Sequence, residues 1–122
     1  MKKFNDAFRG LYLAIRHNSV LIQFLNAILA IVIGFMLKLD YYEWIIFIIL
    51  IALVIMAEMF NTCIEKVCDL VSTEYNEKIR NIKDLSSGTV LFVSIMALII
   101  ALFILINKTL FPLELPTMVV EW

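Results

Sequence analysis

Oxygen-bearing side chains recur every three or four residues in one apolar segment near the middle of this chain. Residues at these spacings lie on one face of a helix. A carboxylate at the level of a membrane is costly, so a row of them marks a functional site by default. We call this row the polar face, and it consists of Glu58, Asn61, Thr62, Glu65 and Asp69.

The spacing of the carboxylates limits the chemistry of the polar face. Glu58 and Glu65 are seven residues apart, which corresponds to about 10 Å along a helix axis. They are too distant to share one proton, but they can take separate roles at two ends of a site. Glu65 and Asp69 are one turn apart and can share a magnesium ion, which takes oxygen ligands.

A second polar group follows at Lys83 and Asp84, at the predicted start of the next helix. The lysine supplies a point charge for phosphate, and backbone N–H groups at a helix start also favour anions. A carboxylate base, magnesium carboxylates and a phosphate-binding lysine are the parts that phosphoryl transfer needs. The spacing alone leaves an alternative open, in which these residues hold membrane helices together or line an ion path.

The composition places these residues in a membrane protein. Of the 122 residues, 63% are hydrophobic, against roughly 45–50% in ordinary globular domains. A soluble fold of this length cannot hide so much apolar surface, and the length fits one domain over residues 1–122. No basic cluster indicates nucleic acid binding, and no glycine-rich phosphate loop indicates a soluble-type nucleotide fold.

The hydrophobic pattern predicts an all-α fold with one surface helix and three membrane spans. Residues 1–17 have the pattern of an amphipathic helix that lies in the membrane interface, or of a short surface arm that packs on its own protein. Spans are expected over residues 20–39, 44–71 and 85–106, because about 20 apolar residues cross a core of roughly 30 Å. A polar connection is expected over residues 72–83 and an irregular tail over residues 107–122.

The distribution of Lys and Arg predicts the orientation in the membrane. Four precede the first span, one follows it, four lie between residues 66 and 83, and one follows the third span. Positive residues stay on the cytoplasmic side, so the N-terminus and the 66–83 region are expected there and the C-terminus outside. The polar face then opens toward the cytoplasm of a bacterial inner membrane, where ATP and magnesium are available.

The two cysteines are not expected to contribute to a site. Cys63 and Cys68 are five residues apart, which does not fit a CxxC metal or redox pair. We expect both to be buried as small hydrophobic residues.

Three motifs in order along the chain resemble the prokaryotic diacylglycerol kinase family, which includes the undecaprenol kinases. They are E-x-x-N-T-x-I-E-x-x-x-D at Glu58–Asp69, E-Y at Glu74–Tyr75 and K-D-x-x-S-G at Lys83–Gly88. The resemblance covers nearly the whole chain. It implies a kinase that uses Mg²⁺ and ATP to phosphorylate a membrane lipid alcohol, and a homotrimer whose sites are shared between neighbouring subunits.

The resemblance also implies roles for residues of the polar face. Glu58 matches the glutamate that acts as general base toward the lipid hydroxyl, with Asn61 beside it. Glu65 matches a magnesium ligand, and Asp69 lies one turn nearer the cytoplasm.

Further residues match positions that contact the nucleotide or the lipid. Ser87 falls where the family contacts the lipid head group. The nucleotide-contacting set comprises Glu74, Tyr75 and Asn76, together with Lys83 and Asp84 for the ATP phosphates and adenosine.

One position departs from the family pattern. After A-F-x-G at Ala7–Gly10, the family places a second metal-binding glutamate eight residues past the glycine, and this chain has Asn18 there. An asparagine offers one neutral carbonyl oxygen and is a poorer magnesium ligand than a carboxylate. Magnesium affinity is then reduced, a carboxylate such as Asp69 compensates, or activity is altered or lost.

The motif wording favours undecaprenol as the substrate. N-T-x-I-E, D-L-V and the short N-terminus look more like undecaprenol kinases than like Gram-negative diacylglycerol kinases. Diacylglycerol, giving phosphatidic acid, is the alternative substrate, and a noncatalytic membrane oligomer with structural carboxylates is the further alternative.

Overall fold

The computed structural model describes residues 2–109, which form four α-helices and no strand within that range. The helices are α1 (Lys2–Ile15), α2 (Asn18–Met36), α3 (Tyr41–Val71) and α4 (Glu77–Thr109). The last three are long and apolar enough to cross a membrane, which confirms the predicted all-α membrane fold. Most of the expected tail, residues 110–122, lies outside the described part.

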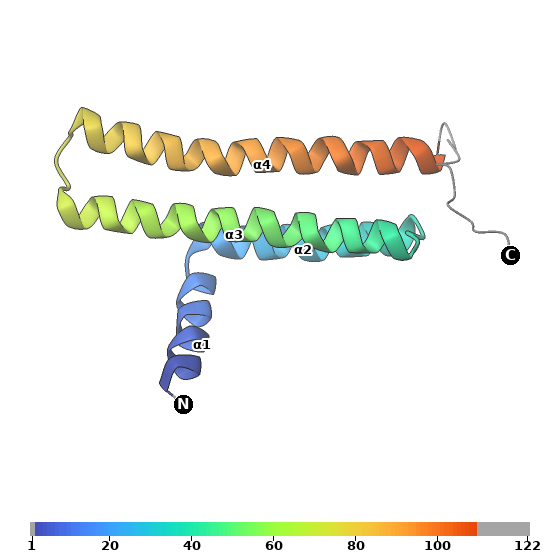
Figure 1. Ribbon diagram of the computed structural model, residues 1–122, viewed down its shortest axis with the longest axis horizontal. Helices are drawn as coiled ribbons and strands as arrows, with labels where there is room; N and C mark the ends of the chain where they lie inside the picture. Colours follow the sequence, from blue (N-terminus) through green and yellow to red (C-terminus); the bar gives the residue numbers. More distant parts are fainter. Residues whose placement is uncertain (1, 110–122) are drawn as a thin grey trace, which may run out of the picture.

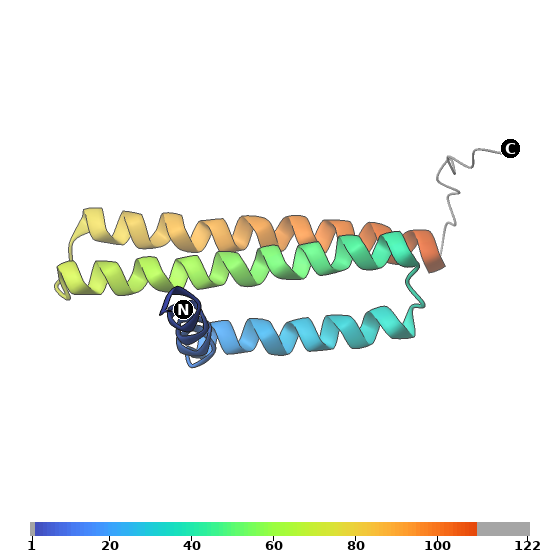
Figure 2. The ribbon, with the colours of Figure 1, turned by 60° about the horizontal axis from the view of Figure 1, so that its bottom comes forward.

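The three long helices run side by side with alternating direction, and α1 turns away from them (Figures 1 and 2). No residue of α1 is buried. Its apolar face is exposed, including Phe4, Phe8, Leu11 and Ile15. This arrangement fits the predicted interfacial helix, since a bilayer surface would cover such a face.

The α2–α3 hairpin closes through one close contact between a glycine and a tryptophan. A Cβ atom on Gly34 would lie 2.7 Å from Trp44 Cη2 and 3.1 Å from Leu39 Cδ1. The Trp44 ring also packs on Phe35, with ring centroids 4.8 Å apart. Only a residue without a side chain leaves room for the indole at this point, so Gly34 sets the distance between the two helices.

The turn before α3 is fixed by backbone conformation and by a helix cap. Lys38 has a φ of 54°, the left-handed conformation that often ends a helix. Asp40 then caps α3, because its Oδ1 accepts a hydrogen bond of 2.9 Å from the Glu43 N–H. This bond lowers the pKa of the Asp40 carboxyl below its usual value.

Helices α3 and α4 are longer than a bilayer core requires. They have 31 and 33 residues, which at 1.5 Å per residue is about 46 to 50 Å, against roughly 30 Å of hydrocarbon. Both helices therefore carry polar ends beyond the apolar region. At one end the connection between them is a short link, residues 72–76.

This short link corrects the predicted connection over residues 72–83. Helix α4 begins at Glu77, because Asn76 Oδ1 accepts hydrogen bonds from the N–H groups of Lys78 and Ile79. A polar segment with helix-forming residues and a cap need not be a loop. Lys83 consequently lies in the second turn of α4, so the expected anion site at a helix start beside it was wrong.

Ion pairs join α3 and α4 near both ends. Lys83 Nζ lies 2.6 Å from Asp69 Oδ1. Lys108 Nζ lies 3.0 Å from Glu43 Oε1 at the opposite end, where the two side chains are only 21% and 18% exposed. The Lys108–Glu43 pair is the better shielded from water, so salt screens it less than the Lys83–Asp69 pair.

Replacing Gly34 with alanine should destabilise the protein. The added methyl group must displace Trp44 and Leu39, and overpacking of this kind costs about 1–3 kcal/mol. The measurement is the unfolding free energy of Gly34→Ala in mixed detergent micelles. The matched control is Gly10→Ala in α1, where an added Cβ meets no atom within 4 Å; equal stability of the two variants would contradict the contact.

Candidate active site

The polar face is buried at its centre and emerges at its end. Glu58, Asn61 and Thr62 are only 7–8% exposed. Glu65 is half-buried and Asp69 is exposed. The predicted common face is therefore present, and it runs from the interior of the helix bundle to the end of α3 that carries the link to α4.

Thr62 connects the polar face to the first turn of α2. Its hydroxyl donates a 2.9 Å hydrogen bond to the backbone carbonyl of Glu58, so the 3.4 Å contact with Ser19 has the Ser19 hydroxyl as donor. Asn18 precedes Ser19 and is exposed. Sequence reasoning missed Ser19, and nothing in its spacing distinguished it from other residues flanking a span.

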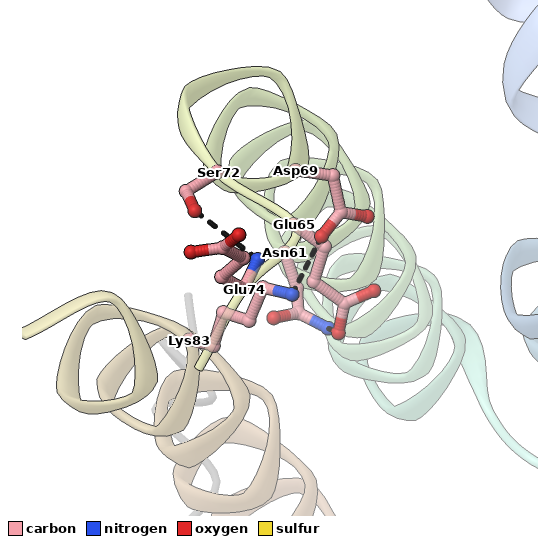
Figure 3. A network of polar contacts seen from close by, with 6 residues as sticks. All are labelled: Asn61, Glu65, Asp69, Ser72, Glu74 and Lys83. Carbon is pink, nitrogen blue, oxygen red and sulfur yellow. Dashed lines mark hydrogen bonds and ion pairs between the residues drawn. The ribbon is translucent and has the colours of Figure 1, made fainter. Parts of the chain in front are cut away.

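Asn61 and Glu65 form the next contact along α3. The Asn61 Nδ2 donates a 3.3 Å hydrogen bond to Glu65 Oε1. Within residues 2–109, the Asn61 Oδ1 is buried and has no hydrogen-bond partner. Figure 3 shows the two side chains pointing toward one another below Asp69.

The exposed end of the site is an ion pair across the two long helices. Asp69 and Lys83 are joined at 2.6 Å, with side chains 51% and 37% exposed (Figure 3). Asp84 lies 3.7 Å from Arg80 on its own helix and is also exposed. Lys83 is therefore brought to the polar face as expected, whereas the Asp84 carboxylate is engaged elsewhere.

The link between α3 and α4 presents its side chains to the surroundings. The Glu74 N–H donates a 3.1 Å hydrogen bond to Ser72 Oγ, and Tyr75 is exposed. Asn76 is exposed but uses its side-chain oxygen to cap α4. Figure 3 shows Glu74 on the same side as Lys83, so the link lies over the exposed end of the site.

Three expectations about individual side chains have mixed outcomes. Ser86 is buried, whereas Ser87, the predicted lipid contact, is exposed in the isolated chain. Cys68 is buried as expected. Cys63 is exposed, so the expectation that both cysteines are buried was wrong for Cys63, because its position falls on the outer face of α3.

The oxygen atoms available for magnesium are few. Among the described residues, no group of three His, Cys, Asp or Glu side chains is placed to hold a metal ion. The half-buried Glu65 carboxylate and the Asn61 amide are joined by a hydrogen bond, which places two candidate oxygen-bearing ligands side by side. Magnesium usually keeps several waters and binds one or two carboxylates plus substrate phosphates, so this small set fits an ion that arrives with a nucleotide.

The fold and the site define an all-α integral membrane protein with a polar face at one end of its helix bundle. The sequence matches the family described as prokaryotic diacylglycerol kinase over residues 5–105. The chain belongs to this family, and it is therefore a lipid kinase. It is also similar to the undecaprenol kinase of Bacillus subtilis (strain 168), with 29% identity over 108 residues, 88% of each chain.

These findings confirm the predicted family and the predicted enzyme class. A lipid kinase uses ATP, so a nucleotide site is part of the protein. The roles assigned to individual residues from the motifs remain predictions, because the comparisons do not assign them.

Removing the charge of Lys83 should weaken nucleotide binding, whereas neutralising Asp69 should not. Their ion pair is exposed, so its loss should have little effect on the stability of the fold. In Asp69→Asn the lysine stays available for phosphate. The measurement is the rise in thermal stability on adding a nonhydrolysable ATP analogue with Mg²⁺, since a ligand of the native state stabilises it.

The control for this pair of variants is Lys78→Ala, which removes an exposed lysine from the first turn of the same helix. It should keep the full stabilisation by the analogue. Full stabilisation of Lys83→Ala as well would show that Lys83 is not the phosphate contact. Loss of stabilisation in Asp69→Asn would instead indicate that the Asp69 carboxylate binds the magnesium ion.

Proposed function

We propose that this protein transfers the γ-phosphate of ATP to the hydroxyl group of undecaprenol, giving undecaprenyl phosphate and ADP. Support comes from the similarity to an undecaprenol kinase and from the N-T-x-I-E and D-L-V wording of the motifs. Diacylglycerol is the competing substrate, because the family description names that lipid.

The observation that carries the proposal is the burial of the Glu58 carboxylate within the apolar spanning helix α3, beside the buried Asn61 and Thr62. A carboxylate held there is costly unless it has a task. As general base, Glu58 takes the proton of the lipid hydroxyl while that oxygen bonds to the γ-phosphorus. The bond from this phosphorus to the bridging oxygen then breaks, and ADP leaves with that oxygen.

The other site residues follow Glu58 toward the end of the helix. Asn61 lies beside the base, and Ser87 is assigned to the lipid head group. Glu65 is the principal magnesium ligand, with Asp69 and Asn18 as the candidates for a second. Bound magnesium would neutralise charge that develops on the phosphates.

The nucleotide would occupy the region around Lys83 and the link between α3 and α4. Lys83 donates to Asp69 at 2.6 Å, and its ammonium group has two further N–H donors for phosphate. Asp84, Glu74, Tyr75 and Asn76 would complete the nucleotide site. By the distribution of Lys and Arg, this end of the molecule faces the cytoplasm and the C-terminus lies outside an inner membrane.

The proposal includes a homotrimer with shared sites. A groove of about 480 Å³ lies between the three long helices, lined by Gln23 and Asn26 of α2 and by apolar residues of α3. Small residues flank it on α2 and α4, namely Ala27, Ala30, Ser94, Ala97 and Ala101. Small residues and amides at a membrane surface suit the close approach of another helix.

Incubation with γ-labelled ATP tests the proposal directly. The purified protein is placed in micelles that contain undecaprenol or diacylglycerol. It should label undecaprenol more efficiently, because the motifs of the protein match those of undecaprenol kinases. The measurement is labelled lipid separated by chromatography. Preferential labelling of diacylglycerol would make diacylglycerol the substrate in place of undecaprenol. If neither lipid became labelled, the proposal would be overturned.

Replacing the general base with its amide should remove turnover but not nucleotide binding. Glu58→Gln keeps the size of the buried side chain and loses the proton acceptor, and such a loss typically costs about 10²–10⁴-fold in rate. Two quantities are measured: the rate of lipid phosphorylation, and the rise in thermal stability of the protein on adding the nonhydrolysable ATP analogue. Glu77→Gln, at an exposed position of α4, is the control; wild-type turnover of Glu58→Gln would show that another group is the base.

A further inference from the structure

The buried oxygen of Asn61 has no protein partner in the described part of the chain. The residue is 7% exposed and its Oδ1 atom accepts no hydrogen bond. Buried polar atoms are nearly always paired with protein, water or an ion, so an unpaired one calls for an explanation. The atom lies in the polar face between Glu58 and Glu65, where a kinase must also hold a cation.

The position of the Asn61 Nδ2 atom shows a place that the Oδ1 atom can also occupy, beside Glu65. Nδ2 lies 3.3 Å from Glu65 Oε1. The two ends of an asparagine amide have nearly the same shape, so a half-turn about the Cβ–Cγ bond exchanges them. Neighbouring oxygens around magnesium lie about 2.9 Å apart, given ligand distances of 2.0–2.1 Å at right angles. A small adjustment of the observed spacing therefore suits a shared cation.

The alternative second ligands are less well placed. Asp69 is held by Lys83 at 2.6 Å. Asn18 is exposed on α2, where its neighbour Ser19 makes the contact with α3 through Thr62. Neither oxygen is recorded in contact with Glu65, whereas Asn61 is already bonded to it.

We infer that Asn61 Oδ1 is the second protein ligand, beside Glu65, of the magnesium ion that accompanies ATP. In the metal-bound state the Asn61 Nδ2 faces away from Glu65 and is available to donate a hydrogen bond to a phosphate oxygen. This inference rests on the proposed function, because ATP brings the ion to the site.

Mn²⁺ in place of Mg²⁺ provides a test that does not depend on turnover. The protein is labelled with ¹³C-asparagine and bound to Mn²⁺ and a nonhydrolysable ATP analogue, and electron–nuclear double resonance detects ¹³C close to the metal. A ¹³C coupling is expected in the wild-type protein, in Asn18→Ala and in the control Asn81→Ala, an exposed position on α4.

The coupling should disappear in both Asn61 variants, with different effects on affinity. Asn61→Ala removes the oxygen and should weaken Mn²⁺ binding about tenfold or more. Asn61→Asp keeps the size and supplies a carboxylate oxygen, so Mn²⁺ affinity should be retained or increased. If Asn61→Ala does not fold, Asn61→Asp still reports the coupling.

Three results would overturn the inference. They are no coupling in the wild-type protein, a coupling that persists in Asn61→Asp, or a coupling lost in Asn18→Ala. A wild-type protein that phosphorylates lipid without a ¹³C coupling would remove this inference and leave the proposed function standing. A wild-type protein that neither binds the Mn²⁺–analogue complex nor phosphorylates lipid would remove both.

Discussion

The structure depends on the burial of oxygen-bearing side chains inside a bundle whose outside is apolar. The most buried side chains of the described helices include Glu58, Asn61, Thr62 and Ser86 as well as a few apolar residues, while large apolar side chains are exposed along all three spans. Lipid is as apolar as those side chains, so no hydrophobic driving force favours their burial between the helices. Polar groups left in lipid would be costly, and their burial decides which face of α3 meets its neighbours.

Because α3 and α4 are long, the site extends from the bilayer interior to the aqueous region. Both helices exceed the thickness of a bilayer core, so one continuous face of α3 passes from the apolar interior to the aqueous region. In the proposed mechanism, the lipid hydroxyl reaches Glu58 and the nucleotide reaches Lys83 from opposite directions. The hairpin that holds these groups is closed by ion pairs at both ends, and the pair at the site end is the more exposed to water.

The polar residues differ in which of their side-chain atoms already have hydrogen-bond or ion-pair partners. Thr62 uses its hydroxyl within the protein, as a donor to Glu58 and an acceptor from Ser19. Asp69 is engaged by Lys83. The buried oxygen of Asn61 remains without a protein partner in the described residues. Asn61, which the motif places beside Glu58, is therefore the residue that we propose as the second ligand of the cation.

The sequence by itself determined the helices, the polar face and the family, because periodicity, hydrophobic length and motif spacing are local properties of the chain. It did not predict that α4 begins at Glu77, since a cap such as Asn76 competes with the polar composition of the segment. It also predicted that Cys63 is buried, whereas the side chain is exposed. Only the tertiary structure decided the pairing of Asp69 with Lys83, the contact of Ser19 with Thr62 and the unpaired Asn61 oxygen. Each depends on the distance and rotation between helices, which packing contacts such as Gly34 against Trp44 set and which no spacing along one helix encodes.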